Sequence, residues 1–341
     1  MSAKQQGFPS ARVQKSWGRI LVLERLLQCL ADGRFHSGSE LGRALGMSRS
    51  AIWKHIRTLE SLGVEIFSVR GRGYRIPGGL DLLDLDACRA ALLPQVSLRL
   101  EALQKHLNTA STNLLAAQAL REGVHHGVYV AEQQTEGRGR RGRRWFSPFA
   151  ANLYMSLAWR MPLGLASLEG LSLAVALALR NALIELGCDA VKVKWPNDLL
   201  IEQAKLAGIL IEVSGDTTTE AQLVIGIGIN VTMMQAPDGA IDQAWTSLQR
   251  SGVQVSRTHL LACVLNHLIL ALEKFEREGF VAFQSDWQNA DAFYGQRSCV
   301  ISGEQVVEGI CLGVNEMGAL QLETEQGRLS LHGGELSLRA L

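Results

Sequence analysis

The first part of the chain carries hydrophobic side chains at helical spacing. Leucine and isoleucine recur every three or four positions over residues 18–34, which predicts an amphipathic helix that ends near Gly33. Ser37 and Glu40 follow with the spacing of a capping box, so we expect a second helix to begin there. Two helices joined by a short connection are therefore predicted before residue 46.

The next segment predicts a third helix and a hairpin. Gly46 breaks the second helix, and Ser48 is a suitable N-cap for a helix over Ser48–Leu62. Two extended runs, Val64–Val69 and Tyr74–Ile76, flank an Arg-Gly-Arg-Gly tip. These elements make up a winged helix-turn-helix, with Ser48–Leu62 as its recognition helix. The candidate DNA-binding residues lie at the start of that helix and at the hairpin tip: Ser48, Arg49, Ser50, Lys54, Arg70 and Arg72.

Charge is distributed unevenly along the chain. Residues 1–79 contain thirteen Lys and Arg against five Asp and Glu, a balance of +8, whereas the remainder contains twenty-one against twenty-eight, a balance of −7. A basic first domain suggests that the N-terminal part meets a polyanion such as DNA. The alternative is a helical protein-interaction domain with a hairpin, which the charge balance and the arginine-tipped hairpin disfavour.

Residues 137–145 read Gly-Arg-Gly-Arg-Arg-Gly-Arg-Arg-Trp. Five arginines on a glycine-rich backbone suit a loop that folds over an anionic ligand, a phosphate or an acyl phosphate; a solvated basic turn is the alternative. The segment also spells G-x-G-x-x-G, but a dinucleotide-binding fingerprint requires a strand before it and a helix after it. Here the extended run Gly127–Ala131 precedes the loop and a second alternating run, Asn152–Trp159, follows it. We therefore reject the dinucleotide-binding interpretation.

Other polar residues lie at the ends of predicted elements. Residues 111–113, Ser-Thr-Asn, precede a helix predicted over Leu114–Glu122, where they either cap the helix or bind a ligand. The alternating strand Lys192–Asp198 ends in Pro-Asn-Asp and leads to the strand Lys205–Glu212. The apolar strand Leu223–Val231 contains two glycines, at which another group can approach the backbone closely.

Two further predictions concern the apolar core and the end of the chain. The run Leu168–Gly187 predicts a buried central helix, because Glu169, Arg180 and Glu185 are too many charges for a membrane span. After residue 294, short extended runs separated by glycine-containing turns predict a small β-barrel. These runs cover residues 298–301, 306–314, 320–324 and 328–331.

Composition sets the class of protein. A length of 341 residues with 47% hydrophobic residues allows two or three domains with proper cores. Residues 1–17 are polar and lack the apolar run of a signal peptide, so we expect a disordered tail and a cytoplasmic protein with no membrane partner. The six cysteines are scattered, with no C-x-x-C motif and no paired spacing. This predicts reduced thiols, neither a zinc site nor a disulfide framework. The cysteines are Cys29, Cys88, Cys188, Cys263, Cys299 and Cys311.

Five motifs together resemble the motif series of the biotin protein ligases. They are Ser111-Thr-Asn113, Gln134 with Gly137 to Arg143, Lys194-Trp-Pro-Asn-Asp198, Lys205-Leu-Ala-Gly208 and Gly226-Ile-Gly-Ile-Asn230. Because a winged helix precedes them, the chain resembles the bifunctional kind, biotin–[acetyl-CoA carboxylase] ligase and biotin operon repressor. The departures are the polar N-terminal tail and Arg144, which stands where lysine is common.

The resemblance implies an α/β (α+β) fold with three domains. These are a winged helix over residues 18–79, a catalytic domain with a mixed sheet like that of class II synthetases over residues 80–294, and an SH3-like domain over residues 295–341. It also implies that the protein joins biotin to ATP with Mg²⁺, forming biotinyl-5′-AMP, and passes biotin to a lysine of the biotin carboxyl carrier protein of acetyl-CoA carboxylase. The adenylate-bound homodimer is then expected to repress biotin synthesis genes at operator DNA.

The same resemblance implies roles for individual residues. Biotin binding is assigned to Ser111, Thr112, Asn113, Gln134, Arg138, Gly139, Arg140 and Lys205. Catalysis is assigned to Lys205, Arg140 and Asp198, with Lys205 as a stabiliser of oxyanions. Nucleotide binding is assigned to Arg143, Trp145, Asn197, Asn230, Trp245 and Arg339. For Trp145 and Trp245 the alternative to nucleotide binding is ordinary core packing. For Arg339 the alternative is a solvent-exposed side chain with no ligand. Mg²⁺ is expected with ATP, not at a protein-only metal site.

Two rival functions stay open at this point. A lipoate or octanoyl ligase relative would share the catalytic fold, but its Arg-Arg-x-x-Gly-Gly-Gly-like segment is not in this sequence. A ligand-sensing transcription factor without catalysis would explain the winged helix alone. The presence of Lys205 together with the full arginine loop argues against that loss of catalysis.

Overall fold

The chain forms two compact units. The computed structural model describes residues 11–216, 219–302, 305–333 and 336–340. One unit spans Met1–Leu82 and the other Leu83–Leu341. Residues 83–341 belong to one unit, so a separate domain that begins at residue 295 stays a prediction, as do the other predicted domain boundaries.

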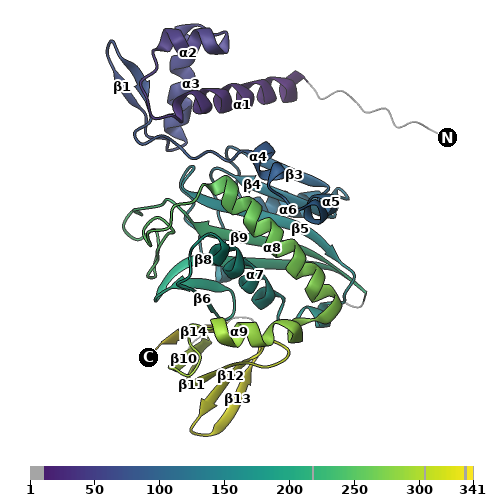
Figure 1. Cartoon of the computed structure of the whole chain (residues 1–341). Helices are drawn as coiled ribbons and strands as arrows, with labels where there is room; N and C mark the ends of the chain where they lie inside the picture. Colours follow the sequence, from purple (N-terminus) through teal and green to yellow (C-terminus); the bar gives the residue numbers. More distant parts are fainter. Residues whose placement is uncertain (1–10, 217–218, 303–304, 334–335, 341) are drawn as a thin grey trace, which may run out of the picture. The chain divides into compact units, whose positions relative to one another are not determined.

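The N-terminal unit has three helices and a two-stranded hairpin (Figure 1). Its elements are α1 (Ala11–Leu30), α2 (Gly38–Leu45), α3 (Arg49–Ser61), β1 (Phe67–Val69) and β2 (Gly73–Arg75). Their order confirms the predicted winged helix-turn-helix. Helix α1 begins at Ala11, not at residue 18, so residues 11–17 are helical and the predicted tail is wrong for them. Residues 1–10 of that predicted tail lie outside the described residues.

Local chemistry explains where these helices begin and end. Ser37 Oγ accepts a hydrogen bond from the Glu40 backbone N–H at 3.1 Å, and Glu40 Oε2 accepts one from the Ser37 N–H at 2.8 Å, so the predicted capping box is present. Gly46 ends α2 with a φ of 66°, in the left-handed region that favours glycine. Ser48 Oγ caps α3 by accepting from the Ala51 N–H. The helices bury a common core: Leu26, Leu27, Leu30, Leu41, Ile52, Ile56 and Leu59.

The second unit is built on a seven-stranded sheet in the order β3-β4-β5-β9-β8-β7-β6. The strands are β3 (Ala102–His106), β4 (His126–Ala131), β5 (Asn152–Met161), β6 (Val191–Lys194), β7 (Asp198–Ile201), β8 (Ala204–Asp216) and β9 (Glu220–Asn230). Only β3 and β4 are parallel among these neighbours, so the predicted mixed sheet is confirmed. The arginine-rich loop connects the antiparallel strands β4 and β5, which confirms that it is no dinucleotide-binding turn.

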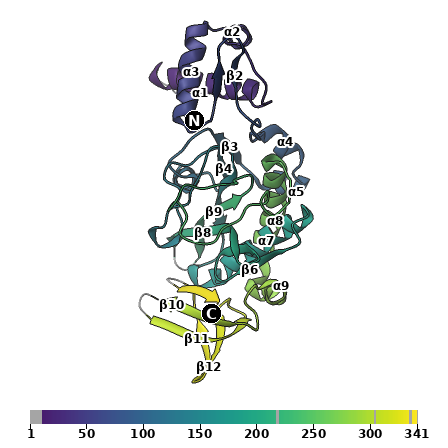
Figure 2. The ribbon, with the colours of Figure 1, turned by 90° about the vertical axis from the view of Figure 1, so that its left-hand side faces the viewer.

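Helices cover both faces of this sheet (Figures 1 and 2). Helix α6 packs on β4, β5 and β9, against residues such as Tyr129 and Ala158. Helices α7 and α8 pack on each other and on the opposite face, where the alternate residues Leu157 and Trp159 are buried. The bounds are α4 (Leu85–Ala90), α5 (Pro94–Arg99), α6 (Thr112–Arg121), α7 (Leu171–Glu185), α8 (Arg257–Glu278) and α9 (Gln284–Ala290).

Two helical segments have the length and hydropathy of membrane spans, Leu165–Glu185 and Arg257–Glu278. They contain α7 and α8, and more than half of each most apolar stretch is buried inside the unit. Burial against the sheet accounts for their apolar composition, since an interior helix is hydrophobic on most sides. Helix α7 is thus the predicted central helix.

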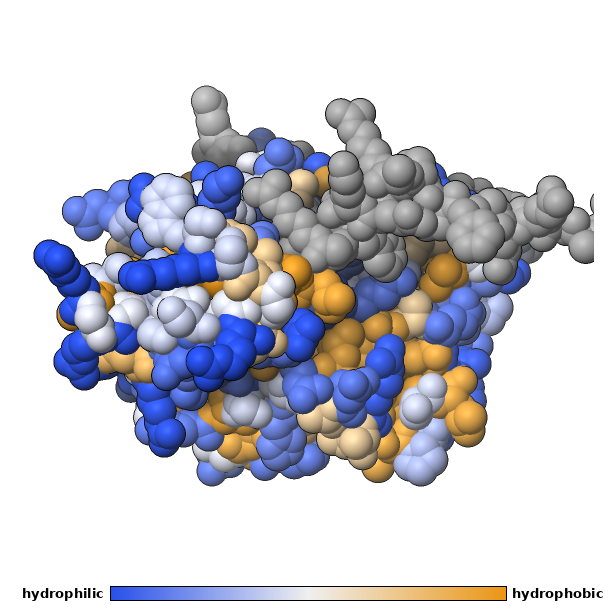
Figure 3. Space-filling view, turned by 90° about the horizontal axis from the view of Figure 1, so that it is seen from above, coloured by the Kyte–Doolittle hydropathy of each residue, from blue (hydrophilic) through white to orange (hydrophobic). Residues whose placement is uncertain are grey.

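On the face seen in Figure 3, hydrophilic side chains surround smaller hydrophobic patches.

The last part of the chain forms a five-stranded antiparallel sheet in the order β13-β12-β11-β10-β14. Its strands are β10 (Arg297–Ser302), β11 (Gln305–Val314), β12 (Leu320–Thr324), β13 (Gly327–Leu331) and β14 (Leu336–Ala340). Four of them were predicted, and β14 was not. Trp195 Nε1 donates a hydrogen bond to the Gly318 carbonyl at 3.1 Å, which ties this sheet to the β6–β7 connection. The SH3-like form of this sheet stays a prediction.

Candidate active site

A cavity of about 420 Å³ lies over strands β8 and β9. Its floor includes Gly208, Gly226 and Gly228. A Cβ atom at Gly226 would clash with the Asn113 side chain, and one at Gly228 would clash with the Trp145 indole. The sequence predicted that the two glycines of the strand Leu223–Val231 allow a close approach to the backbone. This is confirmed, because the Asn113 and Trp145 side chains lie directly against Gly226 and Gly228 of β9.

Residues 111–113 join a buried polar network at one end of the cavity. Ser111 is the N-cap residue of α6, but its side chain makes no capping hydrogen bond, so the interpretation of these residues as a helix cap is wrong for its hydroxyl. The Thr112 backbone N–H and hydroxyl both donate to Gln134 Oε1, at 2.9 and 3.1 Å. Asn113 Nδ2 donates to Glu212 Oε2 at 2.6 Å. Hydrogen bonds within the protein therefore orient the side chains of Thr112, Asn113 and Gln134.

Ser156 of β5 completes this network, and sequence analysis missed it. Its Oγ lies 2.7 Å from Thr112 Oγ1 and 2.6 Å from Asn113 Oδ1. The signal available was a serine inside a strand whose other residues are almost all apolar and buried. A hydroxyl buried at such a position needs partners, which makes it a candidate for the polar site.

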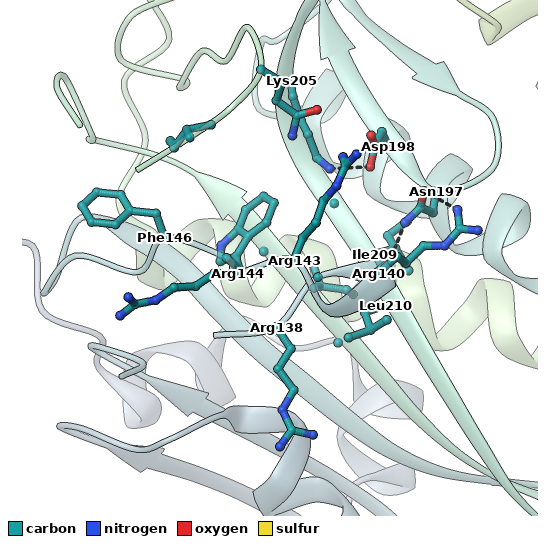
Figure 4. A pocket seen from close by; sticks show the side chains of 18 of the residues that line it. Arg138, Arg140, Arg143, Arg144, Phe146, Asn197, Asp198, Lys205, Ile209 and Leu210 are labelled. Carbon is teal, nitrogen blue, oxygen red and sulfur yellow. Dashed lines mark hydrogen bonds and ion pairs between the residues drawn. The ribbon is translucent and has the colours of Figure 1, made fainter. Parts of the chain in front are cut away.

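The arginine-rich loop closes one side of the cavity. Its backbone folds back on itself through a 2.8 Å hydrogen bond from Gly139 N–H to the Arg143 carbonyl and a bridge between Arg138 and Arg144. In Figure 4, Arg140 and Arg143 point toward Asn197, Asp198 and Lys205, whereas Arg138 and Arg144 point away from them. Loop residues Arg140–Gly142 form a 3₁₀ turn, η1, in which Arg141 has a left-handed φ of 58°.

Arg140 is held in place by the turn between β6 and β7. Its Nη1 donates to Asn197 Oδ1 at 3.1 Å, and Asn197 Nδ2 in turn donates to the Ile209 carbonyl at 2.7 Å (Figure 4). Burial lowers the pKa of Arg140 from its usual value, although a guanidinium stays charged at any neutral pH. The result is a fixed positive charge aimed into the cavity.

Two lysines form a second positive wall. Lys205 Nζ lies 2.7 Å from Asp198 Oδ1, with side chains only 17% and 14% exposed. This is an ion pair without a well-aligned hydrogen bond, so both groups keep capacity for a ligand. Burial lowers the pKa of Lys194, and the Asp198 carboxylate partly offsets that effect. Lys194 stands in a motif that sequence analysis noted, but it was not among the predicted site residues.

Aromatic and amide side chains complete the lining. Trp145 lies over Gly228 with Lys205 Nζ 5.5 Å from its ring, and its buried Nε1 makes no hydrogen bond. Trp245 also lines the cavity, half-buried, under the guanidinium of Arg250. Asn230 Nδ2 donates to the Thr246 carbonyl at 2.9 Å, which fixes the segment that carries Trp245.

The cavity brings together nearly all the predicted ligand-binding and catalytic residues. Among the described residues, Arg339 of β14 is the exception: it does not line the cavity, although its charge helps to lower the pKa of Lys194. Seven Lys and Arg side chains line the cavity against two carboxylates, those of Asp198 and Asp242. Such a lining suits a ligand with several negative charges.

A buried ion pair supports the strands beside this cavity. Arg257 Nη2 lies 2.6 Å from Glu132 Oε2, and both side chains are fully buried. Glu132 Oε1 also accepts from the Leu83 N–H, and Arg257 Nη1 donates to the Asn152 carbonyl. The pair thereby fixes the ends of β4 and β5, which flank the arginine-rich loop. No local pattern in the sequence indicated it.

The predicted DNA-binding residues all lie on the surface of the N-terminal unit. Ser48, Arg49, Ser50 and Lys54 are exposed along α3, as are Arg70 and Arg72 at the hairpin tip. His36 and Tyr74 exchange two backbone hydrogen bonds of 2.9 Å, which anchor the base of the hairpin.

Trp53 lies on the same exposed face of α3, and sequence analysis missed it. Its side chain is 53% exposed, between the exposed residues Arg49, Lys54 and Arg57. An apolar ring in the middle of a basic helix face is unusual for a solvated surface and is typical of a contact surface.

Comparison with known proteins agrees with this geometry. The Biotin/lipoate A/B protein ligase family matches residues 105–230, and an HTH domain matches residues 22–75. The chain is 42% identical to the bifunctional ligase/repressor BirA of Escherichia coli, over 93% of this chain and 97% of that protein. It is 31% identical to the protein of the same name from Bacillus subtilis, over 90% and 95%.

A solved structure has the same fold. The biotin protein ligase of Aquifex aeolicus, in complex with biotin and ATP, superposes with a TM-score of 0.61 and 30% identity, and covers 71% of this chain and all of that one. The helix-turn-helix unit, the mixed sheet and the similarity over almost the full length agree with one another. The chain therefore belongs to the bifunctional ligase/repressor family of biotin protein ligases.

Proposed function

We propose that this protein activates biotin with ATP to biotinyl-5′-AMP and transfers the biotinyl group to a lysine of a biotin carboxyl carrier protein. The observation that carries the proposal is the cavity itself, whose lining combines the uncharged polar side chains of Ser111, Thr112, Asn113 and Gln134 with seven Lys and Arg side chains. Biotin has a neutral ureido ring and an anionic carboxylate, and ATP is a polyanion. The two halves of the cavity match these two chemistries.

The neutral end is proposed to hold the biotin ring system. A ureido group has two N–H donors and one carbonyl acceptor, so its partners must include both kinds of group. Ser111, Thr112, Asn113 and Gln134 provide hydroxyl and amide groups of both kinds. Because Gln134, Ser156 and Glu212 already orient Thr112 and Asn113, little side-chain entropy is lost when biotin binds.

The cationic wall is proposed to carry the chemistry of the first step. A biotin carboxylate oxygen attacks the α-phosphorus of ATP, the bond to the β-phosphate oxygen breaks, and pyrophosphate leaves. Arg138, Gly139 and Arg140 border the carboxylate and α-phosphate, with Arg143, Asn197 and Asn230 on the nucleotide. Lys205, fixed by Asp198, stabilises the oxyanions of the transition state. Trp145 and Trp245 supply apolar surface for biotin and adenine.

Mg²⁺ is proposed to accompany ATP. The described residues that line the cavity include only two carboxylates, Asp198 and Asp242, and Asp198 is paired with Lys205. That donor set fits an ion held chiefly by phosphate oxygens and water, with Asp198 or Asp242 as outer partners. The ion supplies charge neutralisation of the triphosphate when bound.

The second step is proposed to take place at the same wall. The acceptor lysine attacks the acyl carbon of the mixed anhydride, the acyl–oxygen bond breaks, and AMP leaves. Asp198 is the carboxylate closest to this chemistry and is proposed to take the proton of the acceptor amine. Closure of the arginine-rich loop would keep water from the anhydride meanwhile.

The N-terminal unit is proposed to bind operator DNA when the protein is an adenylate-bound homodimer. Support comes from the exposed basic face of α3, the arginine-tipped hairpin and the +8 balance of residues 1–79. A dimer is proposed because one winged helix makes few base contacts. We expect the protein to act in the cytoplasm, where carrier protein and DNA are both present.

One assay tests the enzymatic proposal. The protein is incubated with ATP, Mg²⁺, biotin and a carboxyl carrier domain, and the carrier is examined for added biotin by mass. Product that depends on both ATP and biotin is the expected result. Lipoate in place of biotin tests the lipoate-ligase alternative, and no product with either acid would leave a DNA-binding sensor without catalysis.

A further inference from the structure

A second cluster of chemically active side chains lies away from the cavity, where helices α7 and α8 pack together. Glu185 is the last residue of α7, and Cys263 and His267 lie four residues apart on α8. Residues at this spacing share one face of a helix. Their possible ligand atoms (a carboxylate oxygen, the thiol sulfur and an imidazole nitrogen) all lie within 4.8 Å of one another.

The contacts within this cluster keep the Glu185 carboxylate, the Cys263 thiol and the His267 imidazole close to one another. His267 Nε2 lies 2.8 Å from Glu185 Oε2. The Cys263 thiol donates a long, 3.5 Å hydrogen bond to the Ala182 carbonyl and also interacts with the Glu185 carboxylate. In a tetrahedral zinc site, ligand atoms at the usual metal distances lie about 3.3–3.6 Å apart, so small rotations would bring this set into place.

Burial falls in steps across the cluster. Cys263 is 4% exposed, the His267 side chain 31% and the Glu185 side chain 63%. A soft sulfur ligand therefore lies at the base, and the carboxylate lies at the entrance, where an ion can enter from water. The solvent side leaves room for a water molecule as a fourth ligand, an arrangement of three protein ligands and water that is common for zinc.

We propose that Glu185, Cys263 and His267 form a binding site for a borderline divalent transition-metal ion, with Zn²⁺ as the reference ion. Thiolate, imidazole and carboxylate ligands together favour such an ion over Mg²⁺, which takes oxygen ligands. This site departs from the prediction that the cysteines bind no zinc. That prediction relied on sequence spacing, whereas here the ligands come from two helices 78 residues apart, from 185 to 263.

Other uses of this cysteine fit less well. Burial raises the pKa of the Cys263 thiol to about 12, with a further contribution from Glu185, so without an ion the thiol stays protonated. A protonated buried thiol is a poor nucleophile and a poor redox sensor. An isolated His267–Glu185 surface pair would explain two of the three groups, whereas all three place their ligand atoms within 4.8 Å of one another.

The proposed ion would act on the scaffold of the active site without touching the substrates. It would link the end of α7 to α8, whereas at the other end of α7 Ser172 Oγ donates to the Pro196 carbonyl next to Asn197. The two ends of this 15-residue helix are about 20 Å apart at 1.5 Å per residue. Binding at the cluster should therefore stabilise the unit while the cavity stays free.

The test uses the full chain, freed of metal with a chelator, and Co²⁺ as a spectroscopic probe of the zinc site. We expect one equivalent of Co²⁺ to produce a thiolate charge-transfer band and the intense visible bands of a tetrahedral site, and Zn²⁺ to abolish both. Zn²⁺ should also raise the Tm of the wild type. No cysteine is among the described residues that line the cavity, so Co²⁺ bound there would produce no thiolate band.

Matched variants assign the site. Cys263→Ser and His267→Ala should lose the thiolate band and the rise in Tm, and Glu185→Gln should weaken binding at least tenfold. Cys188→Ala, which removes a buried thiol just beyond α7, should keep both signals. An unchanged band in Cys263→Ser, or no thiolate band in the wild type at millimolar Co²⁺, would overturn the proposal. His267→Ala removes a half-exposed side chain, so it serves if Cys263→Ser fails to fold.

Discussion

Lys205→Ala should keep the fold of the second unit and slow the formation of the adenylate. Lys205 lies at the start of β8, next to the glycine floor, with its ammonium group against Asp198 and above Trp145. Its position is thus set by both an ion pair and a ring. We expect it to stabilise the oxyanions that form as the biotin carboxylate attacks the α-phosphate.

The magnitude follows from the burial of the pair. Loss of one preorganised donor at a developing oxyanion typically lowers kcat about 10²–10³-fold, which is about 2.7–4 kcal/mol. The same change leaves Asp198 without its nearest cation. Breaking a fully buried ion pair lowers the free energy of unfolding by about 3–5 kcal/mol. Because the Lys205 and Asp198 side chains are 17% and 14% exposed, we expect a smaller loss of about 1–3 kcal/mol. That loss is smaller than the stability of an ordinary domain, about 5–15 kcal/mol.

The assay is the rate of pyrophosphate release with saturating biotin and ATP. Lys192→Ala is the matched control, because Lys192 is exposed on β6 and does not line the cavity. The double variant Lys205→Ala with Asp198→Asn separates two roles. If Lys205 merely neutralised Asp198, the double variant would regain the wild-type rate. That recovery, or an unchanged rate in Lys205→Ala, would refute a direct role for Lys205 at the oxyanions.

Three further changes test other parts of the structure. Gly226→Ala places a methyl group against Asn113 and should raise the KM for biotin about 10–100-fold with little change for ATP, since overpacking costs about 1–3 kcal/mol; equal changes in both values would contradict this. Trp53→Ala should weaken operator binding about tenfold without altering its salt dependence, because no charge is removed; an unchanged affinity would exclude a contact. Burial raises the pKa of Asp291 from 3.8 to about 6, so the folded state retains a proton that the unfolded state releases. Unfolding free energy should fall by up to about 3 kcal/mol as pH rises from 4 to 6, and Asp291→Asn should remove this slope in a pH series of urea denaturation.

The N-terminal unit was predictable because its signals are local. Ser37, Glu40 and Gly46 mark helix ends through hydrogen bonds and backbone angles that involve only neighbouring residues. The limits of that reasoning appear at Ala11, where α1 begins although residues 11–17 have no strong apolar pattern. The short strands β7 and β14 were also missed: β7 follows directly on the Pro-Asn-Asp turn, and both have only four or five residues.

The site residues were predictable as motifs, but local patterns could not predict that the motifs lie close together in the fold. The motifs lie at or near the ends of strands and helices, and it is the order β5-β9-β8 that places Ser156, Gly226 and Leu210 side by side. Sheet order depends on pairings between distant segments, and hydrophobic periodicity indicates only which face of a strand is buried. The five motifs carried the prediction because the resemblance supplied what the periodicity lacked.

Buried polar partners were the hardest part to predict, for an energetic reason. A charged or amide side chain is tolerated inside a protein only when its partner is present, and here the partners are remote: the buried Asn113 bonds to the exposed Glu212, 99 residues away, and the buried Glu132 to Arg257, 125 residues away. In the sequence, each of these residues looks like an ordinary surface residue. Because breaking a buried ion pair leaves an uncompensated charge, Glu132 and Arg257 hold the strand ends around the arginine-rich loop, and the Asn113–Glu212 hydrogen bond orients Asn113 at the cavity. We therefore expect specificity for biotin to depend on Glu212 and Ser156 as much as on the residues that touch the ligand.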